Sequence, residues 1–452
     1  MRPTNLPVVV IGAGPVGLAA AAHLVSRGEK PIVLEAGRSV GASVLRWGHV
    51  RIFSPWRHNV DAAAAALLEA SGWERPPDGE HPTGRELVER YLAPLAALPA
   101  ISPHLRMATR VVAVGRRGLD RIKTAGREDA PFVVRVESAG VESEILARAV
   151  IDASGTYDTP NPVGGNGLPA IGEARAADRI FYGIPDVPGR DRHRYAGRRV
   201  LVVGSGHSAQ NVLLELAVLT HQEPTTRITW AVRRSTLDGL FGGGRRDQLE
   251  ERARLGSRAR ALVERGALTI VRSFAISRLE LTSEGIVASS GDTRLPPVDE
   301  IVAATGFRPD LAPLREVRLE LDPILESPAV LAPLIDPNVH SCGTVPPHGA
   351  EELSQPEKNF YIVGMKSYGR APTFLMLTGY EQVRSVVCAL TGDLEGARDV
   401  RLVLPETGVC SSDGLVAAAT ACCAPAGESS GCGDTCATPI PLQLAQASSG
   451  CC

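Results

Sequence analysis

The stretch VVVIGAGPVG near the start of the chain constrains its fold more than any other feature. The β-branched run VVVI is typical of a strand buried on both faces of a parallel sheet. Gly12, Gly14 and Gly17 follow with the spacing G-x-G-x-x-G, and they open a segment with the composition of a helix. The next apolar run, KPIVLEAG, ends at Glu35. A strand, a glycine turn, a helix and a strand with an acid about 20 residues on predict a dinucleotide-binding unit.

Each residue of this motif has a physical role in such a unit. Gly12 allows the tight turn, Gly14 lets the backbone approach a pyrophosphate, and Gly17 lets the helix pack on the strand. The free N–H groups and the positive dipole end of the helix attract phosphate. Glu35 is expected to accept hydrogen bonds from the adenosine ribose hydroxyls.

A second glycine motif lies in RRVLVVGSGHSAQNVLLELAVL, where Gly204 and Gly206 are followed by Ser208 and Ala209. The strand predicted to close this unit, RITWAVRR, ends in Arg233-Arg234 instead of an acid. A guanidinium at this position suits a 2′-phosphate, so the second site is predicted to bind NADPH rather than NADH or FAD. Two alternatives stay open: a solvated strand end, or arginines that contact FAD or substrate.

The chain also contains two similar segments farther on, RAVIDASGTYDTPNP and DEIVAATGFRPDL. Each has an apolar strand that ends in a turn of small residues, and each follows a hairpin-like stretch. Two α/β modules, one nested within the other, are the simplest explanation. The predicted fold class is therefore α/β, with two nested Rossmann-like domains and a disordered, Cys-rich C-terminal tail.

The tail holds seven of the nine cysteines, all within the last 43 residues. Its composition of Ala, Ser, Gly, Pro and Cys cannot bury enough apolar surface to order itself. Vicinal thiolates bind soft ions well, so arsenite or Hg(II) is a predicted ligand. The predicted metal-binding residues are Cys422, Cys423, Cys432, Cys436, Cys451 and Cys452. Incidental cysteines, copper or zinc binding, and redox buffering stay open as alternatives.

Other classes of function are disfavoured by the composition. The formal net charge is −2 and no long basic block occurs, so no nucleic-acid partner is expected. The apolar N-terminal run is interrupted by glycines and Pro15, which argues against a membrane anchor. A cytoplasmic location is expected, where disulfides are kept reduced and clustered cysteines more often bind metals or do redox chemistry.

Residues 6–400 resemble the two-dinucleotide-binding-domain flavoproteins, and within them the single-component, flavin-containing, NADPH-dependent monooxygenases. The resemblance implies FAD at the first glycine turn and NADPH at the second. The segment FYIVGMKSYGR looks like the last FAD-contacting strand, which places Gly364 near the flavin. The implied domains are residues 1–165 (FAD, first part), 166–300 (inserted NADPH domain), 301–402 (FAD, second part) and 403–452 (tail). One departure is VPGRDRHRY, a degenerate match to the F-x-G-x-x-x-H-x-x-x-[FY] motif of these monooxygenases.

The whole chain, tail included, is similar to the flavin-binding monooxygenase-like proteins of bacterial arsenic-resistance operons. The match rests on RYAGRRVLVVGSGHSA, LIDPNVHSCGTVPPHGA, YIVGMKSYGRAPTFLM and the Cys-Cys tail. It implies an FAD- and NADPH-dependent oxidoreductase that acts on a small molecule and whose tail captures trivalent arsenic. Two alternatives remain: a reductase of metal ions or disulfides that uses tail thiols, and a metalloid-binding tail on an enzyme of unrelated substrate. A thioredoxin-type protein is an expected reductant of the tail.

The segment VLRWGHVRIFSPWRHNVD follows the Glu35 strand, where related enzymes line the flavin. The resemblance implies that Trp47 and Trp56 flank the ring and that Asn59 hydrogen-bonds activated oxygen. Cys342, in the loop VHSCGTVPPHGA, is a further candidate catalytic residue. The alternatives are core packing for the tryptophans and turn chemistry for Cys342. Disulfide reductases of this class need two cysteines beside the flavin, and this chain has no cysteine before Cys342.

Overall fold

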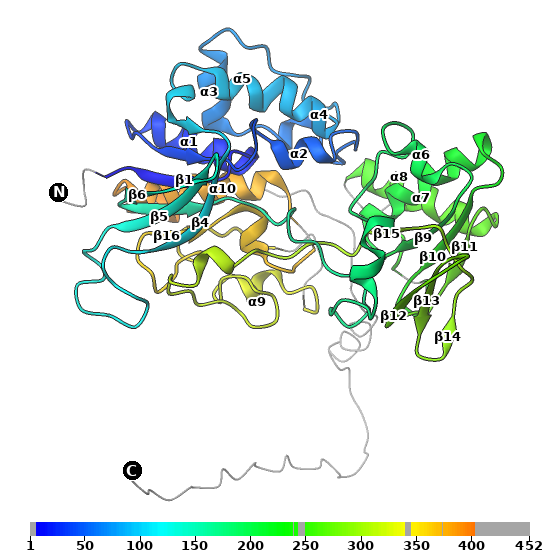
Figure 1. Cartoon of the computed structure of the whole chain (residues 1–452). Coiled ribbons are helices and arrows are strands. Elements are labelled where there is room, and N and C mark those ends of the chain that lie inside the picture. Colours follow the sequence, from blue (N-terminus) through cyan, green and yellow to red (C-terminus); the bar gives the residue numbers. More distant parts are fainter. Residues whose placement is uncertain (1–5, 238, 243–248, 340–344, 373, 403–452) are drawn as a thin grey trace, which may run out of the picture. The chain divides into compact units, whose positions relative to one another are not determined.

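The computed structural model describes residues 6–402, apart from 238, 243–248, 340–344 and 373 (Figure 1). These residues fall within one compact unit, which contains two parallel sheets. The predicted Cys-rich tail and Cys342 lie outside the described residues.

The first sheet is parallel, with the strand order β16-β7-β1-β2-β3. Its strands are β1 (Val8–Ile11), β2 (Ile32–Leu34), β3 (Leu105–Arg106), β7 (Ala149–Asp152) and β16 (Phe360–Ile362). Strands β1 and β7 are buried along their whole length, as expected for a sheet covered on both faces. The chain leaves this sheet after β7, at Asp152, and returns to it at β16, which begins more than 200 residues later at Phe360.

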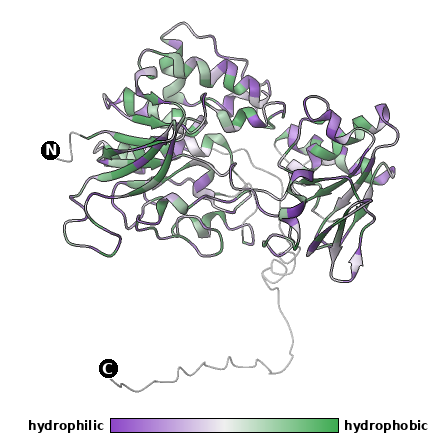
Figure 2. Ribbon diagram, viewed as in Figure 1, coloured by the Kyte–Doolittle hydropathy of each residue, from purple (hydrophilic) through white to green (hydrophobic). Residues whose placement is uncertain are grey.

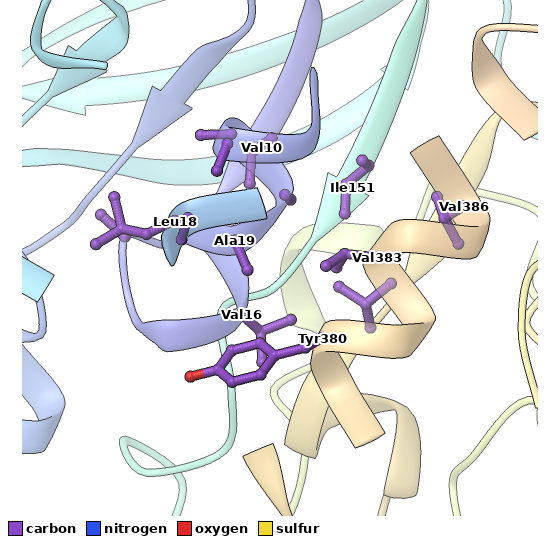
Figure 3. Packing of buried hydrophobic residues seen from close by; sticks show 14 of the residues in the cluster. Val10, Val16, Leu18, Ala19, Ile151, Tyr380, Val383 and Val386 are labelled. Atoms are coloured by element: carbon purple, nitrogen blue, oxygen red, sulfur yellow. The ribbon is translucent and has the colours of Figure 1, made fainter. Parts of the chain in front are cut away.

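Helix α1 (Pro15–Ser26) follows β1 and packs against α10 (Met376–Leu390). Figure 3 shows Val16 and Ala19 of α1 facing Tyr380 and Val383 of α10, beside Ile151 of β7. The alanines of α1 are almost fully buried because small side chains let the two helices and the sheet approach closely. This contact joins the two ends of the described chain.

A helical segment connects β2 to β3. It contains α2 (Ala42–Arg46), η2 (Trp56–His58), α3 (Ala62–Glu69), α4 (Gly84–Leu87), η3 (Val88–Leu92), α5 (Ala93–Ala97) and η4 (Ser102–His104). Helix α3 begins where the Asp61 carboxylate accepts a hydrogen bond from Ala64 N, and α4 begins with a capping box of Thr83 and Glu86. Local sequence therefore sets where these helices start.

Antiparallel strands accompany the first sheet, as the hairpin-like stretches predict. They are β4 (Thr109–Arg116), β5 (Phe132–Ser138) and β6 (Val141–Ala147), paired in the order β4-β5-β6. Their inward side chains form a core with β1 and β16 that includes Phe132 and Phe360, whose ring centroids are 6.2 Å apart. Helices α1 and α10 cover one face of the first sheet, and strands β4, β5 and β6 cover the other.

The second sheet is also parallel, with the order β11-β10-β9-β15-β8. Its strands are β8 (Ile180–Tyr182), β9 (Arg199–Val203), β10 (Arg227–Ala231), β11 (Thr269–Val271) and β15 (Glu300–Ala303). Helices α7 (His207–Gln222) and α8 (Glu250–Glu264) accompany it, with an antiparallel set of β12 (Arg278–Thr282), β13 (Gly285–Ser290) and β14 (Thr293–Arg294). The remaining short elements are η5 (Glu173–Arg179), α6 (Arg192–Tyr195), η7 (Ala312–Leu314), α9 (Ala332–Ile335), η8 (Gly364–Tyr368) and α11 (Leu394–Arg398).

Two chain segments connect the modules, and they pair with each other. Asn161 N donates to Gly306 O at 2.9 Å, and Thr305 Oγ1 donates to Asn161 O at 2.7 Å. Arg308 Nε donates to Asn161 Oδ1 at 2.8 Å. The predicted fold class of two nested Rossmann-like units is confirmed. Strand β15 belongs to the second sheet, so that sheet extends past the predicted domain boundary at residue 300.

Hydropathy follows this layering, with apolar residues along the strands and polar residues on the outer helix faces (Figure 2). No helix in the described part of the chain is long and apolar enough to cross a membrane.

Candidate functional site

The first glycine turn has the crowding that its motif predicts. A β-carbon on Gly17 would lie 1.9 Å from Gly12 O, and one on Gly12 would lie 2.8 Å from Ala153 O. Gly12 also has φ +100°, a conformation that side chains disfavour. A β-carbon on Gly14, by contrast, would meet no atom within 4 Å. Gly12 and Gly17 therefore close the turn, while open space remains beside Gly14.

Glu35 follows β2 and fixes the backbone of this turn. Its Oε2 accepts a hydrogen bond from Ala13 N at 2.8 Å, and its Oε1 accepts one from Gly37 N at 2.7 Å. A carboxylate has about four acceptor positions, so each oxygen can still accept a ribose hydroxyl. The predicted ribose-binding acid thus lies beside the glycine turn, and it also shapes that turn.

Gly364 lies against the start of α1, and its predicted place near the flavin stays a prediction. It begins η8 with φ +68°, and a β-carbon there would lie 3.2 Å from Val16 Cγ2. Gly364 N donates to Gln382 Oε1 of α10 at 2.7 Å. The turn after β16 is therefore held next to the glycine turn after β1 by a side chain from a third element.

The amide of Gln382 is oriented in turn by a buried histidine, His348. Gln382 Nε2 lies 3.0 Å from His348 Nε2, and His348 Nδ1 lies 3.0 Å from Pro346 O. Because a carbonyl oxygen only accepts, Nδ1 carries the hydrogen and Nε2 accepts from Gln382. Burial lowers the pKa of His348, which favours this neutral ring. Sequence analysis missed this network because its members are far apart in the chain.

A second group that sequence analysis missed is a buried ion pair at the carboxyl edge of the first sheet. Lys366 Nζ donates to Asp152 Oδ2 at 2.7 Å and to Ser154 Oγ at 3.1 Å. Ser154 Oγ donates to Asp152 Oδ1 at 2.6 Å. The side chains of Lys366 and Asp152 are 3% and 2% exposed. A charged residue two positions after the predicted flavin-contacting Gly364 is the signal that would have found this pair.

The second glycine turn repeats the geometry of the first. Gly204 has φ +124°, and a β-carbon there would lie 2.2 Å from Ala304 O. A β-carbon on Gly206 would meet nothing within 4 Å. Ala209 is fully buried in the first turn of α7, where Ser208 is half-buried beside it. The small residue at the third motif position thus lies in the core between helix and strand.

Arg233 and Arg234 follow β10 at its carboxyl end, one strand from the second glycine turn. Trp230 of β10 donates from Nε1 to Gly204 O at 2.7 Å, which joins the strand to that turn. Arg233 is exposed, and its Nη1 donates to Gly165 O at 2.9 Å. A guanidinium has five donors, so Arg233 retains donors for a phosphate. The position fits the predicted 2′-phosphate contact, which stays a prediction.

The side-chain amide of Asn59 makes two hydrogen bonds with Ser54. Ser54 Oγ donates to Asn59 Oδ1 at 2.8 Å, and Asn59 Nδ2 donates to Ser54 O at 2.7 Å. Asn59 is fully buried, and its backbone carbonyl oxygen accepts a hydrogen bond from the Tyr380 hydroxyl at 2.9 Å. These contacts support a structural role, and the catalytic assignment stays a prediction.

Of the two tryptophans predicted to flank the flavin, Trp56 is 1% exposed and belongs to the core. Trp47 is half-buried, and its ring would lie 2.8 Å from a β-carbon on Gly84. The burial of Trp56 agrees with the alternative in which this side chain packs in the core. A cofactor contact of Trp47 stays a prediction.

A cavity of about 380 Å³ lies beside Trp56, in the range of small-molecule sites. Its lining residues carry both signs of charge: Arg51, Trp56, Glu80, His81, Pro82, Glu86, Arg90 and Glu251. The Arg90 guanidinium lies 5.5 Å from the centroid of the Trp56 ring. The lining suits a polar small molecule.

The predicted metal ligands and Cys342 lie outside the described residues, so the structure leaves them untested. Within the described ranges, no group of three or more His, Cys, Asp or Glu residues could hold a metal ion. Cys388 of α10 is the free cysteine of this part of the chain, and it is buried. Its sulfur accepts a hydrogen bond from Arg27 Nη2 at 2.8 Å.

The family model described as "Pyridine nucleotide-disulphide oxidoreductase" matches residues 9–330, which include both glycine turns. The chain belongs to this family. The oxidoreductase is 28% identical over 311 residues to a ferredoxin–NADP reductase of Verminephrobacter eiseniae, covering 68% of this chain and 73% of that protein. It is 28% identical over 236 residues to indole-3-pyruvate monooxygenase YUCCA1 of Oryza sativa, covering 48% of this chain and 46% of the relative.

Among solved structures, the oxidoreductase resembles the bacillithiol disulfide reductase Bdr of Bacillus cereus. The TM-score is 0.62 at 19% identity, and the match covers 86% of this chain and 99% of that chain. This likeness concerns the fold alone. The prediction of an FAD-dependent NADPH oxidoreductase is confirmed at the level of the family.

The residues present fit both nucleotide cofactors. Each glycine turn leaves open space at its second glycine, where a diphosphate would approach the backbone. Glu35 at the first turn suits the ribose hydroxyls of FAD, and Arg233 at the second suits the 2′-phosphate of NADPH. A side chain at Gly14 or Gly206 would fill the space that each diphosphate needs.

Proposed function

We propose that the oxidoreductase is an NADPH-dependent flavin monooxygenase whose C-terminal tail captures trivalent arsenic. The observation that carries the first half is the placement of its cysteines. No cysteine precedes Cys342, and Cys388 is buried beneath Arg27 at the end of α10. The first glycine turn therefore has no dithiol beside it in the described residues, so the electrons need another acceptor. Molecular oxygen is the acceptor in this proposal.

In this function a bound flavin would supply the redox chemistry between NADPH and oxygen. The protein's own residues bind and orient. Gly12, Gly14 and Gly17 admit the FAD diphosphate to the start of α1, while Glu35 holds the ribose. Gln382 keeps the turn at Gly364 beside α1. Arg233 would select the phosphorylated nicotinamide cofactor.

The arsenic half rests on the tail sequence and on the similarity to proteins of arsenic-resistance operons. Seven cysteines lie within the last 43 residues, including the vicinal pairs Cys422-Cys423 and Cys451-Cys452. Trivalent arsenic binds two or three thiolates together, and a soft ion of this kind prefers sulfur ligands. The tail would present the metalloid as substrate.

A second candidate is a reductase that passes electrons to an external acceptor. The relative that supports it is the ferredoxin–NADP reductase, whose match covers more of this chain than the monooxygenase match does. A reductase needs no cysteine beside its flavin when its acceptor is another molecule. Tail thiols as the electron acceptor are a variant of the same candidate.

The test follows NADPH oxidation and oxygen consumption by the purified full chain, with and without arsenite. A monooxygenase consumes oxygen in proportion to NADPH and oxidises arsenite or another substrate. Rapid mixing of the NADPH-reduced protein with oxygen then follows flavin reoxidation directly. NADPH oxidation that needs ferricyanide or a ferredoxin and consumes no oxygen would favour the reductase. The matched control is the chain without residues 410–452.

A further inference from the structure

Lys366 is a buried cation in the part of the first sheet where the FAD diphosphate is expected. It belongs to η8, two residues after Gly364, and its side chain is 3% exposed. Asp152, its ion-pair partner, ends β7 between β1 and β16. The carboxyl ends of parallel strands are where open α/β sheets bind their ligands.

The ion pair is connected to the first glycine turn through Ser154. Ser154 Oγ lies 3.1 Å from Lys366 Nζ, and Ser154 Cα would lie 3.2 Å from a β-carbon on Gly12. The same β-carbon on Gly12 would lie 2.8 Å from Ala153 O. One residue thus touches both the buried ammonium and the turn that receives the cofactor.

The two hydrogen bonds of the Lys366 ammonium group use two of its three N–H donors. An ammonium group has three N–H donors, and the described residues provide two acceptors, Asp152 Oδ2 and Ser154 Oγ. Buried polar groups are almost always hydrogen-bonded, so the third donor needs an acceptor. A diphosphate oxygen is an anionic acceptor that suits an ammonium ion.

We propose that Lys366 binds the diphosphate of FAD with this third donor. Asp152 and Ser154 act as positioning residues that fix the ammonium beside the glycine turn. The inference rests on FAD binding at the first turn, and it is independent of whether the enzyme hydroxylates a substrate or passes electrons to another acceptor. It assigns a cationic diphosphate contact that the glycine motif itself lacks.

The test compares apoproteins of the wild type and of the double variant D152N/K366M, titrated with FAD and followed by flavin fluorescence. Removing both charges avoids leaving a buried ion unpaired, and such neutral replacements often preserve stability. We expect the double variant to fold, and its Kd for FAD to rise by roughly tenfold to a hundredfold, as for a lost hydrogen bond to a charged group. A Kd within about twofold of wild type would overturn the proposal.

ADP-ribose, titrated with the second nucleotide site saturated by NADP+, separates a diphosphate contact from a general effect on the flavin pocket, because it keeps the diphosphate and lacks the flavin. Its affinity for the apoprotein should fall by a factor similar to that for FAD. Equal ADP-ribose affinities in the two proteins would contradict the diphosphate contact. If D152N/K366M does not fold, D152N/K366Q keeps amide donors for the internal hydrogen bonds, and the same outcomes apply to it.

A control for the loss of an ion pair elsewhere is the double variant R199M/D299N in the second module, where the pair is more exposed than that of Lys366 and Asp152. This ion pair has the same charges, with Arg199 Nη2 2.7 Å from Asp299 Oδ1, but it joins β9 to the start of β15. Its removal should leave the FAD and ADP-ribose affinities unchanged. A loss as large as that of D152N/K366M would show that any lost ion pair weakens FAD binding, and it would overturn the specific role of Lys366.

Discussion

The carbonyl oxygen of Gly12 lies 1.9 Å from the position that a β-carbon on Gly17 would occupy. Any side chain at Gly17 would therefore push α1 away from the turn that follows β1. Gly14, two residues after Gly12, has no atom within 4 Å of the same position. The glycines of one motif thus have different roles: the fold requires Gly17, and we expect the ligand to require Gly14.

Replacing Gly14 with valine should lower FAD occupancy while leaving the apoprotein stable. The β-carbon of the added side chain meets no protein atom within 4 Å, and the side chain would fill the space that the diphosphate needs. Replacing Gly17 with alanine should instead destabilise the apoprotein by roughly 3 kcal/mol, because the new methyl group meets backbone. Flavin absorbance and thermal unfolding of the two apoproteins measure these effects. Full FAD occupancy in Gly14→Val would contradict the assignment of the first site.

Replacing Arg233 and Arg234 with alanine should erode a preference for NADPH over NADH. The Kd for NADPH should rise by roughly tenfold or more, as for a lost arginine–phosphate contact, while binding of NADH stays nearly unchanged. Titration of each variant with both nucleotides measures the ratio of affinities. An unaltered ratio in the double variant would rule out the 2′-phosphate contact.

His348 should make the protein less stable in acid. Burial lowers its pKa, so the folded state binds fewer protons than the unfolded state, whose histidine has an ordinary pKa of about 6.5. Its contribution to stability is therefore present above pH 6.5 and is lost as the pH falls below that value. The midpoint of thermal unfolding, measured between pH 8 and pH 5, should fall less steeply in His348→Gln. Identical slopes in the two proteins would show that His348 does not titrate on unfolding.

Glu215 of α7 should have the opposite dependence on pH. Burial raises its pKa to about 7, and its Oε2 is buried without a hydrogen-bond partner among the described residues. The folded state therefore binds more protons than the unfolded state, whose glutamate has an ordinary pKa. Its contribution to stability falls as the pH rises from about 4.5 through 7. Glu215→Gln should raise the unfolding temperature at pH 8 more than at pH 5, and an equal change at both values would contradict the prediction.

Deleting residues 410–452 should leave FAD content and NADPH oxidation largely intact, because the tail lacks the apolar content to contribute to a core. Arsenite binding should fall sharply, since capture by several thiolates needs clustered sulfurs. Replacing Cys422 and Cys423 with serine should give an intermediate loss. Equilibrium dialysis of reduced protein against arsenite measures binding, and equal binding by the truncated and full chains would exclude the tail as the metalloid site.

The parts of the site that sequence analysis predicted depend on residues close together in the chain. Gly12, Gly14, Gly17 and Glu35 lie within one strand–turn–helix–strand unit, and the structure places all four at one turn. The second unit was found in the same way. Backbone sterics demand glycine at a crowded turn wherever the motif occurs, so a local pattern was sufficient.

The sheet to which a strand belongs was harder to predict. The buried run of β15 would suit either parallel sheet, and a predicted boundary at residue 300 cut it from the module that it completes. Its pairing with β9 and β8 is a long-range contact that the composition of the strand does not encode.

The sequence alone determined the fold class, the two glycine turns and the family-level enzyme class, because each depends on short-range geometry. The tertiary structure decided which distant polar groups meet at the first turn. Lys366 and Asp152 are 214 positions apart, and Gln382 is 34 positions from His348. Such partners are chosen by burial, since a polar group removed from water must find its partner wherever the packed elements bring one within reach.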